Sequence, residues 1–171
     1  FVMYAPYAVH TPIQAGSEAV AAMKIRHPQM NDRSARYAVM VEATDRAVGT
    51  ILAAVDLDRT VVCFASDNGG LQPVTDMSPW RGGKGMLYEG GVRTPLFVRV
   101  PGVPAGEVET PVQLFDVHPT LVELAGAVMP ADRPIDAVSL MPALRGEPLD
   151  RGSLFWHFPA YLEGRDAESH D

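Results

Sequence analysis

The 171-residue sequence contains a single cysteine, Cys63. One cysteine excludes an internal disulfide and any zinc site built from several cysteines. No apolar run approaches the roughly 18 residues that a membrane-spanning helix needs. Basic residues are also few, since 14 Lys and Arg against 21 Asp and Glu give a formal net charge of −7. The sequence therefore predicts no membrane span and no generic nucleic-acid binding, which needs a basic surface.

The rest of the composition is that of a globular domain. Hydrophobic residues make up 47% of the chain and charged residues 20%, which excludes whole-chain disorder. The length suits one domain with a substantial core. With 15 glycines and 15 prolines, we expect many loops between the regular elements.

The apolar spacing predicts alternating strands and helices. Two continuous apolar runs, residues 60–65 and 95–100, have the pattern of neighbouring strands buried on both faces, as in a parallel sheet. Cys63 is then a small buried hydrophobe, and the opening residues 1–5 form another buried strand rather than a signal peptide. The pattern indicates an α/β fold with a largely parallel sheet.

The predicted helices carry recognisable start and stop signals. Asn31 or Asp32 caps a long helix that runs to about Val55 and packs on the sheet with one apolar face. The other expected helices run from Ser17 to about Arg26, from Asp116 or His118 to a stop at Gly126, and from Ser139 to Arg145; Ser153 to Phe158 is a possible last strand.

Polar residues follow two of these strands, at the sheet edge where α/β proteins bind ligands. Asp67 and Asn68, in the run Ser-Asp-Asn-Gly-Gly at 66–70, offer the hard oxygen ligands that Ca²⁺ or Mg²⁺ prefers. The same run is also ordinary turn composition. His10, after the first strand, is either a general acid or anion contact, or a plain surface residue.

The loop between the two central strands carries two further motifs. In Arg-Gly-Gly-Lys-Gly at 81–85, glycines leave Lys84 open to a sulfate or phosphate oxygen, although a solvated loop lysine is the simpler interpretation. No P-loop pattern is present. In residues 88–95, Glu89 and Arg93 are expected to form a structural pair. His118 and His157 have apolar neighbours and are expected to be structural.

In this order the motifs resemble the sulfatase family, of the alkaline-phosphatase-like superfamily, over essentially the whole chain. The matching stretches are residues 7–12, 37–49, 66–70, 81–85, 88–95, 115–121 and 154–159. The resemblance implies an alkaline-phosphatase-like α/β fold, with a mixed, mostly parallel sheet flanked by helices. It also implies a sulfuric ester hydrolase that acts on a small-molecule or glycan sulfate ester.

The resemblance also implies roles for four residues. Asp67 and Asn68 would be two ligands of one divalent cation, Ca²⁺ or alternatively Mg²⁺. Lys84 would contact the sulfate oxygens and the leaving-group oxygen. His10 would contact the sulfate and help to protonate the departing alcohol. The resemblance further implies that the enzyme is periplasmic or secreted.

One family feature has no counterpart in the sequence. Sulfatases use a formylglycine made from the Cys or Ser of a Cys/Ser-x-Pro/Ala-x-Arg motif, which the 171 residues lack. We therefore expect residues 1–150 to be the carboxyl-terminal portion of a catalytic domain, residues 151–171 to begin an incomplete C-terminal subdomain, the metal site to be incomplete and the chain alone to be inactive. The alternatives are a phosphonate or phosphate ester hydrolase of the same superfamily, and a non-catalytic remnant or binding module.

Overall fold

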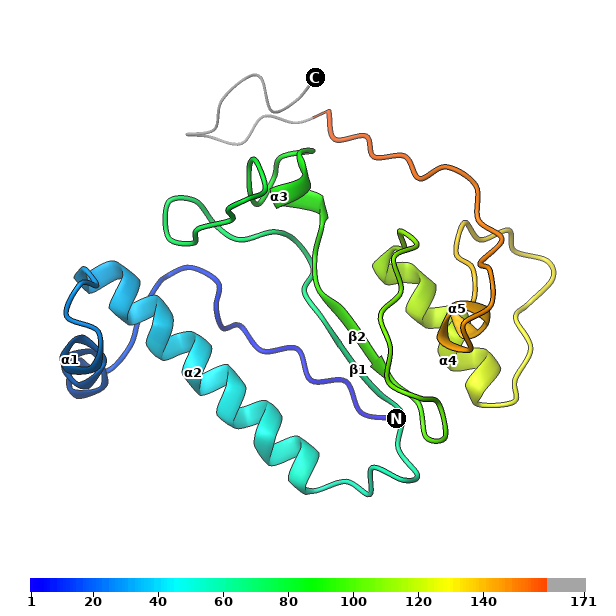
Figure 1. Ribbon diagram of the computed structural model, residues 1–171, viewed down its shortest axis with the longest axis horizontal. Coiled ribbons are helices and arrows are strands. Elements are labelled where there is room, and N and C mark those ends of the chain that lie inside the picture. The colour runs from blue at the N-terminus through cyan, green and yellow to red at the C-terminus, as the bar shows by residue number, and fades with distance from the viewer. Residues whose placement is uncertain (160–171) are drawn as a thin grey trace.

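A computed structural model describes residues 1–159 of the chain. Figure 1 shows α1 and α2 on one side of a pair of strands and α4 and α5 on the other, with α3 beyond one end of the strands. The helices are α1 (Ser17–Arg26), α2 (Asp32–Ala53), α3 (Glu89–Val92), α4 (Val117–Leu124) and α5 (Met141–Leu144), the strands are β1 (Val62–Ala65) and β2 (Leu96–Arg99), and Leu114–Asp116 form a 3₁₀ turn, η1.

The long helix α2 begins where its capping signal predicts. The side chain of Asn31 accepts a hydrogen bond from the Ser34 amide at 2.9 Å, which satisfies one of the free donors of the first turn. The helix packs against α1 rather than on the sheet, contrary to our expectation. The connection from α1 to α2 is short, so the two helices fold back on each other, and Val20, Met23, Ala35 and Val39 form their buried core.

Two ion pairs join α1 to α2 at the surface. Lys24 lies 2.5 Å from Asp32, and the guanidinium of Arg26 lies 2.9 Å from the carboxylate of Glu42. Hydrogen bonding to Lys24 lowers the pKa of Asp32, and hydrogen bonding to Arg26 lowers the pKa of Glu42. Both carboxylates are therefore charged at neutral pH, and each joins α2 to a basic residue of α1.

The two predicted strands are neighbours, as expected, but they run antiparallel. Phe64 lies opposite Phe97, with ring centroids 6.1 Å apart. A parallel pair would need a connection that returns along the sheet. Here the whole loop 66–95 stays at one end of the strands, where the Ser66 amide donates to the Pro95 carbonyl, so β2 must run back along β1.

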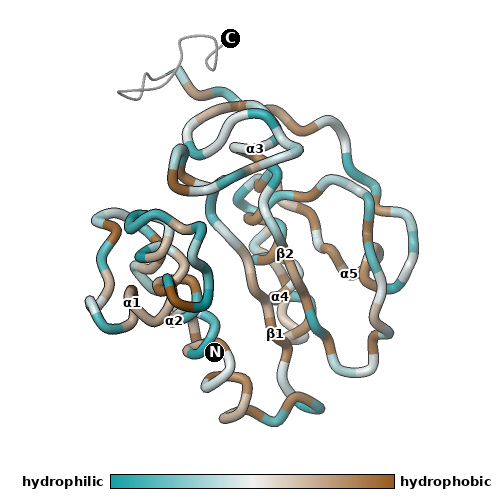
Figure 2. Tube along the Cα trace, turned by 60° about the vertical axis from the view of Figure 1, so that its left-hand side comes forward, coloured by the Kyte–Doolittle hydropathy of each residue, from teal (hydrophilic) through white to brown (hydrophobic). Residues whose placement is uncertain are grey.

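Within residues 1–159 the strand pair is more exposed than the apolar runs predict. Phe64 is 43% exposed and Phe97 65% exposed, and Figure 2 shows the hydrophobic colour running along β1. The prediction of a buried Cys63 is wrong, because its side chain is exposed. Partial desolvation still raises the pKa of its thiol. A raised pKa disfavours the thiolate, so Cys63 is not an activated nucleophile.

A buried carboxylate organises the carboxyl-terminal part of the fold. Asp116 accepts hydrogen bonds from the amides of Gln113 at 2.7 Å and Val138 at 3.0 Å, and it pairs with Arg151. The hydroxyl of Thr120 donates to the Asp116 carbonyl at 2.6 Å. These contacts connect η1 and α4 to the segments around residues 138 and 151. Helix α4 then ends near Gly126, which has a φ of +70°, as the sequence predicts.

Two predicted strands are not formed. Residues 1–5 are exposed and adopt no regular structure, and residues 153–158 also form no strand. A strand needs a partner for its main-chain donors and acceptors, and the sheet of the described residues contains only β1 and β2. The remainder of the predicted subdomain, residues 160–171, lies outside the described residues. None of the helices in residues 1–159 is long and apolar enough to cross a membrane.

Candidate functional site

The three motifs of the central loop meet beyond the carboxyl end of β1, near α3 in Figure 1. Main-chain hydrogen bonds join them. The Gly69 amide donates to the Gly91 carbonyl at 3.0 Å, and the Lys84 amide donates to the Gly70 carbonyl at 2.9 Å. The Gly90 amide donates to the Arg81 carbonyl at 2.8 Å. The segments 66–70, 81–85 and 88–95 therefore form one unit.

Glycines make this unit possible because its backbones touch. A Cβ atom at Gly69 would lie 1.8 Å from the carbonyl oxygen of Gly90, and one at Gly91 would lie 1.9 Å from that of Met86. A Cβ at Gly83 would lie 2.5 Å from the Gly70 carbonyl oxygen. No side chain fits at such separations. The glycines of these motifs thus allow main chain to pack directly on main chain.

Charged and aromatic side chains hold the outside of the unit. The guanidinium of Arg93 lies 4.3 Å from the ring centre of Trp80 and 3.3 Å from the carboxylate of Glu89. The predicted pairing of Glu89 and Arg93 is therefore confirmed. Arg81 stacks on Tyr88 at 3.9 Å. Lys84, by contrast, forms no ion pair with any residue of the described range 1–159.

Asp67 and Asn68 lie at the carboxyl end of β1, as the sequence predicts. Asp67 is exposed and Asn68 half-buried. Among residues 1–159 neither side chain takes part in a hydrogen bond or ion pair, so both keep their oxygens for another ligand. These oxygens suit a hard cation, but they are two donors where Ca²⁺ takes six to eight. Over the same residues no three His, Cys, Asp or Glu side chains gather into a metal-binding group.

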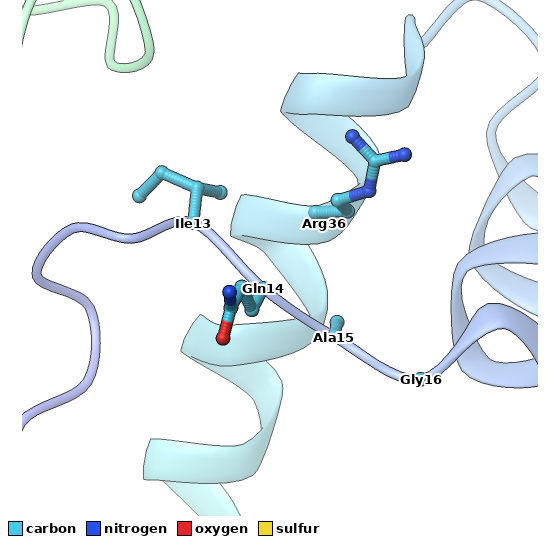
Figure 3. A pocket seen from close by; sticks show the side chains of 5 residues that line it. All are labelled: Ile13, Gln14, Ala15, Gly16 and Arg36. Atoms are coloured by element: carbon cyan, nitrogen blue, oxygen red, sulfur yellow. The ribbon is translucent and has the colours of Figure 1, made fainter.

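Within residues 1–159 no hydrogen bond or ion pair joins His10 to this unit. His10 is exposed, its Nδ1 atom lies 2.9 Å from the Thr11 carbonyl oxygen, and its amide donates to the Tyr7 carbonyl. Residues 13–16 follow His10 in the chain, and an open hollow of about 700 Å³ lies between them and α2. Figure 3 shows Arg36 projecting from α2 beside this segment. Hydrogen bonds within residues 1–159 thus join the loops of Asp67, Asn68 and Lys84, and none of them involves His10.

The sequence missed a second hollow, which adjoins the Lys84 loop. It has a volume of about 220 Å³ and is lined by residues 85–87, Gly91 and residues 156–158. His157 was predicted to be structural but is exposed and lines this hollow, and His118 is exposed on α4. The aromatic run Phe-Trp-His-Phe at 155–158 could have pointed to this hollow. It lies far from Lys84 along the chain, so the sequence does not show that the two segments line the same hollow.

Comparison with known proteins matches the Sulfatase family model to residues 1–127. The chain belongs to the sulfatase family. It is 38% identical to a sulfatase of Formosa agariphila, over 97% of this chain and 34% of that protein. It is 39% identical to human arylsulfatase H, over 90% of this chain and 29% of that protein. The sulfatase chain described here thus spans about a third of the length of these curated relatives.

Two solved structures confirm the predicted fold class. The crystal structure of Ps i-CgsB in complex with k-i-k-neocarrahexaose superposes with a TM-score of 0.73 at 36% identity, covering 82% of this chain and 32% of that one. The PsFucS1 sulfatase from Pseudoalteromonas sp. gives a TM-score of 0.53 at 30% identity, covering 76% and 26%. The α/β fold is therefore alkaline-phosphatase-like, and the antiparallel β1–β2 pair is the part of its sheet within residues 1–159.

Proposed function

We propose that this chain supplies the Lys84 and Asp67–Asn68 part of the active site of a sulfate ester hydrolase. The observation that carries the proposal is the hydrogen bond from the Lys84 amide to the Gly70 carbonyl at 2.9 Å. It holds the Lys84 loop against the segment that bears Asp67 and Asn68, and within residues 1–159 none of these three side chains has an ion-pair partner. A cation and a lysine ammonium that lie side by side can both bind the oxygens of one group, such as a sulfuryl group.

Lys84 would stabilise the negative charge that grows on the sulfuryl and leaving-group oxygens. Its glycine neighbours leave the ammonium free to approach an oxygen closely. Asp67 and Asn68 would occupy two coordination positions of a divalent cation, Ca²⁺ or alternatively Mg²⁺. When bound, such a cation supplies Lewis-acid stabilisation of the same charge.

His10 would contact the sulfate and protonate the departing alcohol, as the family resemblance implies. Within residues 1–159 the His10 side chain is exposed, so a substrate can reach the imidazole. The expected nucleophile, formylglycine, has no source motif among the 171 residues. We therefore propose that the isolated chain binds sulfate but does not turn over a sulfate ester.

A sulfated glycan is the proposed substrate class. The support is the neighbour Ps i-CgsB, whose crystal structure holds k-i-k-neocarrahexaose, a carrageenan oligosaccharide. A polymeric glycan is met outside the cytoplasm, so this substrate agrees with the periplasmic or secreted location that the family resemblance implies. An aryl sulfate serves as a convenient assay substrate of the same chemical class.

The experiment compares the full-length gene product with the 171-residue chain on sulfate, phosphate and phosphonate monoesters. We expect the full-length protein to have its highest kcat/KM on the sulfate ester and the isolated chain to give no turnover. A higher kcat/KM on the phosphonate or phosphate ester would favour the alternative hydrolase. No turnover of any ester by the full-length protein would favour the non-catalytic remnant.

A further inference from the structure

The hollow of about 220 Å³ beside the Lys84 loop is built from two distant parts of the chain. Residues 85–87 and Gly91 form one side, and residues 156–158 form the other. Figure 1 shows the segment that leads to residue 159 passing above the α3 loop. The fold thus brings an aromatic run to the edge of the proposed sulfate site.

The lining suits one flat ring. Trp156, one of the lining residues, is 47% exposed, so part of its surface is open to a ligand. The facing side is made of Met86, Leu87 and glycine backbone, which carries no charge. Aromatic faces bind the apolar face of another ring. The volume is below the roughly 300–1,000 Å³ of pockets for drug-sized ligands, and therefore suits a single ring.

Lys84 gives this hollow a charged neighbour. It directly precedes Gly85, the first lining residue, and its amide is held by the Gly70 carbonyl. The described residues 1–159 place no carboxylate within ion-pair distance of its ammonium. The organic part of a sulfate ester bound at Lys84 would lie at the Gly85 edge of the hollow that Trp156 also lines. This step rests on the proposed function.

We propose that the hollow binds the sugar ring that carries the sulfate, and that Trp156 stacks on this ring as a specificity-determining residue. A pyranose has an apolar C–H face for the indole and hydroxyl groups on its edge. The imidazole of His157, also in the lining, can hydrogen-bond to such a hydroxyl. A bare aryl ring would leave that imidazole without a partner.

The two tryptophans of the chain make the proposal testable by NMR on the 171-residue chain. Trp80 is similarly exposed, at 40%, but stacks on Arg93 outside the hollow, so it is an internal control. On titration with galactose 4-sulfate, the indole N–H of Trp156 and the amide of Lys84 should shift saturably, while the indole N–H of Trp80 stays in place.

The possible outcomes separate the two proposals. A shift at Lys84 without one at Trp156 would overturn the stacking proposal and leave the sulfate contact in place. A shift at Trp156 with unsulfated galactose, and none at Lys84 with the sulfated sugar, would reject both the sulfate contact and the placement built on it. No response at either residue contradicts both. Tighter binding of phenyl sulfate than of galactose 4-sulfate would reject the sugar.

Matched substitutions add magnitudes. Trp156→Ala should raise the Kd for galactose 4-sulfate roughly 10-fold and change that for inorganic sulfate by less than about twofold. Lys84→Ala should weaken both. Trp156→Phe, which keeps a ring, should restore part of the sugar affinity and guards against a misfolded alanine variant. Equal losses of sugar and inorganic sulfate affinity in Trp156→Ala would overturn the proposal.

Discussion

Truncation of Asp116 should destabilise the chain strongly, because three donors depend on its buried carboxylate. Its carboxylate accepts hydrogen bonds from the amides of Gln113 and Val138 and pairs with Arg151, whose side chain is 6% exposed. Asp116→Ala leaves two main-chain donors and a buried guanidinium without this acceptor. Removal of one partner of a buried ion pair costs about 3–5 kcal/mol. We expect a loss of this size in the free energy of unfolding.

Urea unfolding followed by circular dichroism measures the loss. With an m-value of about 2 kcal/mol per M, the midpoint should fall by about 2 M. Glu89→Ala is the matched control, since its pair with Arg93 is half-exposed at 56% and 62% and should contribute less than about 1 kcal/mol. A loss of less than about 1 kcal/mol for Asp116→Ala would refute the anchoring role of the carboxylate.

Arg151 provides a second arm of the same test. Its Nε and Nη1 atoms are buried and have no hydrogen-bond partner among residues 1–159. Within this range, the carboxylate of Asp116 is therefore the group that compensates the buried positive charge of Arg151. In the Asp116→Ala background, the further change Arg151→Met removes an unpaired buried charge and should recover part of the lost stability. Losses that simply add in the double variant would show that the two side chains are not coupled.

Two further predictions concern packing and charge. Gly69→Ala should lower the free energy of unfolding by roughly 2 kcal/mol or more, because its Cβ would meet the Gly90 carbonyl. Gly49→Ala is the control: a Cβ there meets nothing within 4 Å, so this helical substitution should raise the free energy of unfolding by about 0.5–1 kcal/mol. Similar urea midpoints would contradict the close packing. The lowered pKa of Glu42 means that the native state binds fewer protons than the unfolded state, so the stability from its pair with Arg26 is present above about pH 4.3 and is lost as the pH falls through the lowered pKa. Glu42→Gln should flatten the acid side of the urea-midpoint profile, and an unchanged profile would argue against the pair.

Local signals were sufficient to predict most elements. The cap at Asn31 and the apolar period gave α2, and the two apolar runs gave β1 and β2. The direction of β2 could not be predicted in this way, because it depends on where the loop 66–95 returns. The burial expected for Phe64 and Phe97 failed for a related reason: an apolar run indicates that a strand can be covered, not which residues cover it.

The motif residues could be predicted, but the contacts between them could not. Asp67, Asn68 and Lys84 were identifiable from their chemistry and the glycines beside them. The packing of Gly69 against Gly90 joins positions in two different motifs, and no local pattern encodes it. Asp116 likewise reads as an ordinary helix start, because its partners near residues 138 and 151 are distant in the sequence.

The role of Lys84 is the central claim, and one substitution tests it directly. In the full-length gene product, Lys84→Ala should lower kcat/KM for a sulfate ester roughly 10²–10³-fold, as expected for loss of a donor to the transition-state charge. Lys24→Ala is the matched control, because that exposed lysine pairs with Asp32 at the α1–α2 surface and should leave turnover within about twofold. Unchanged turnover in Lys84→Ala would contradict the proposed site.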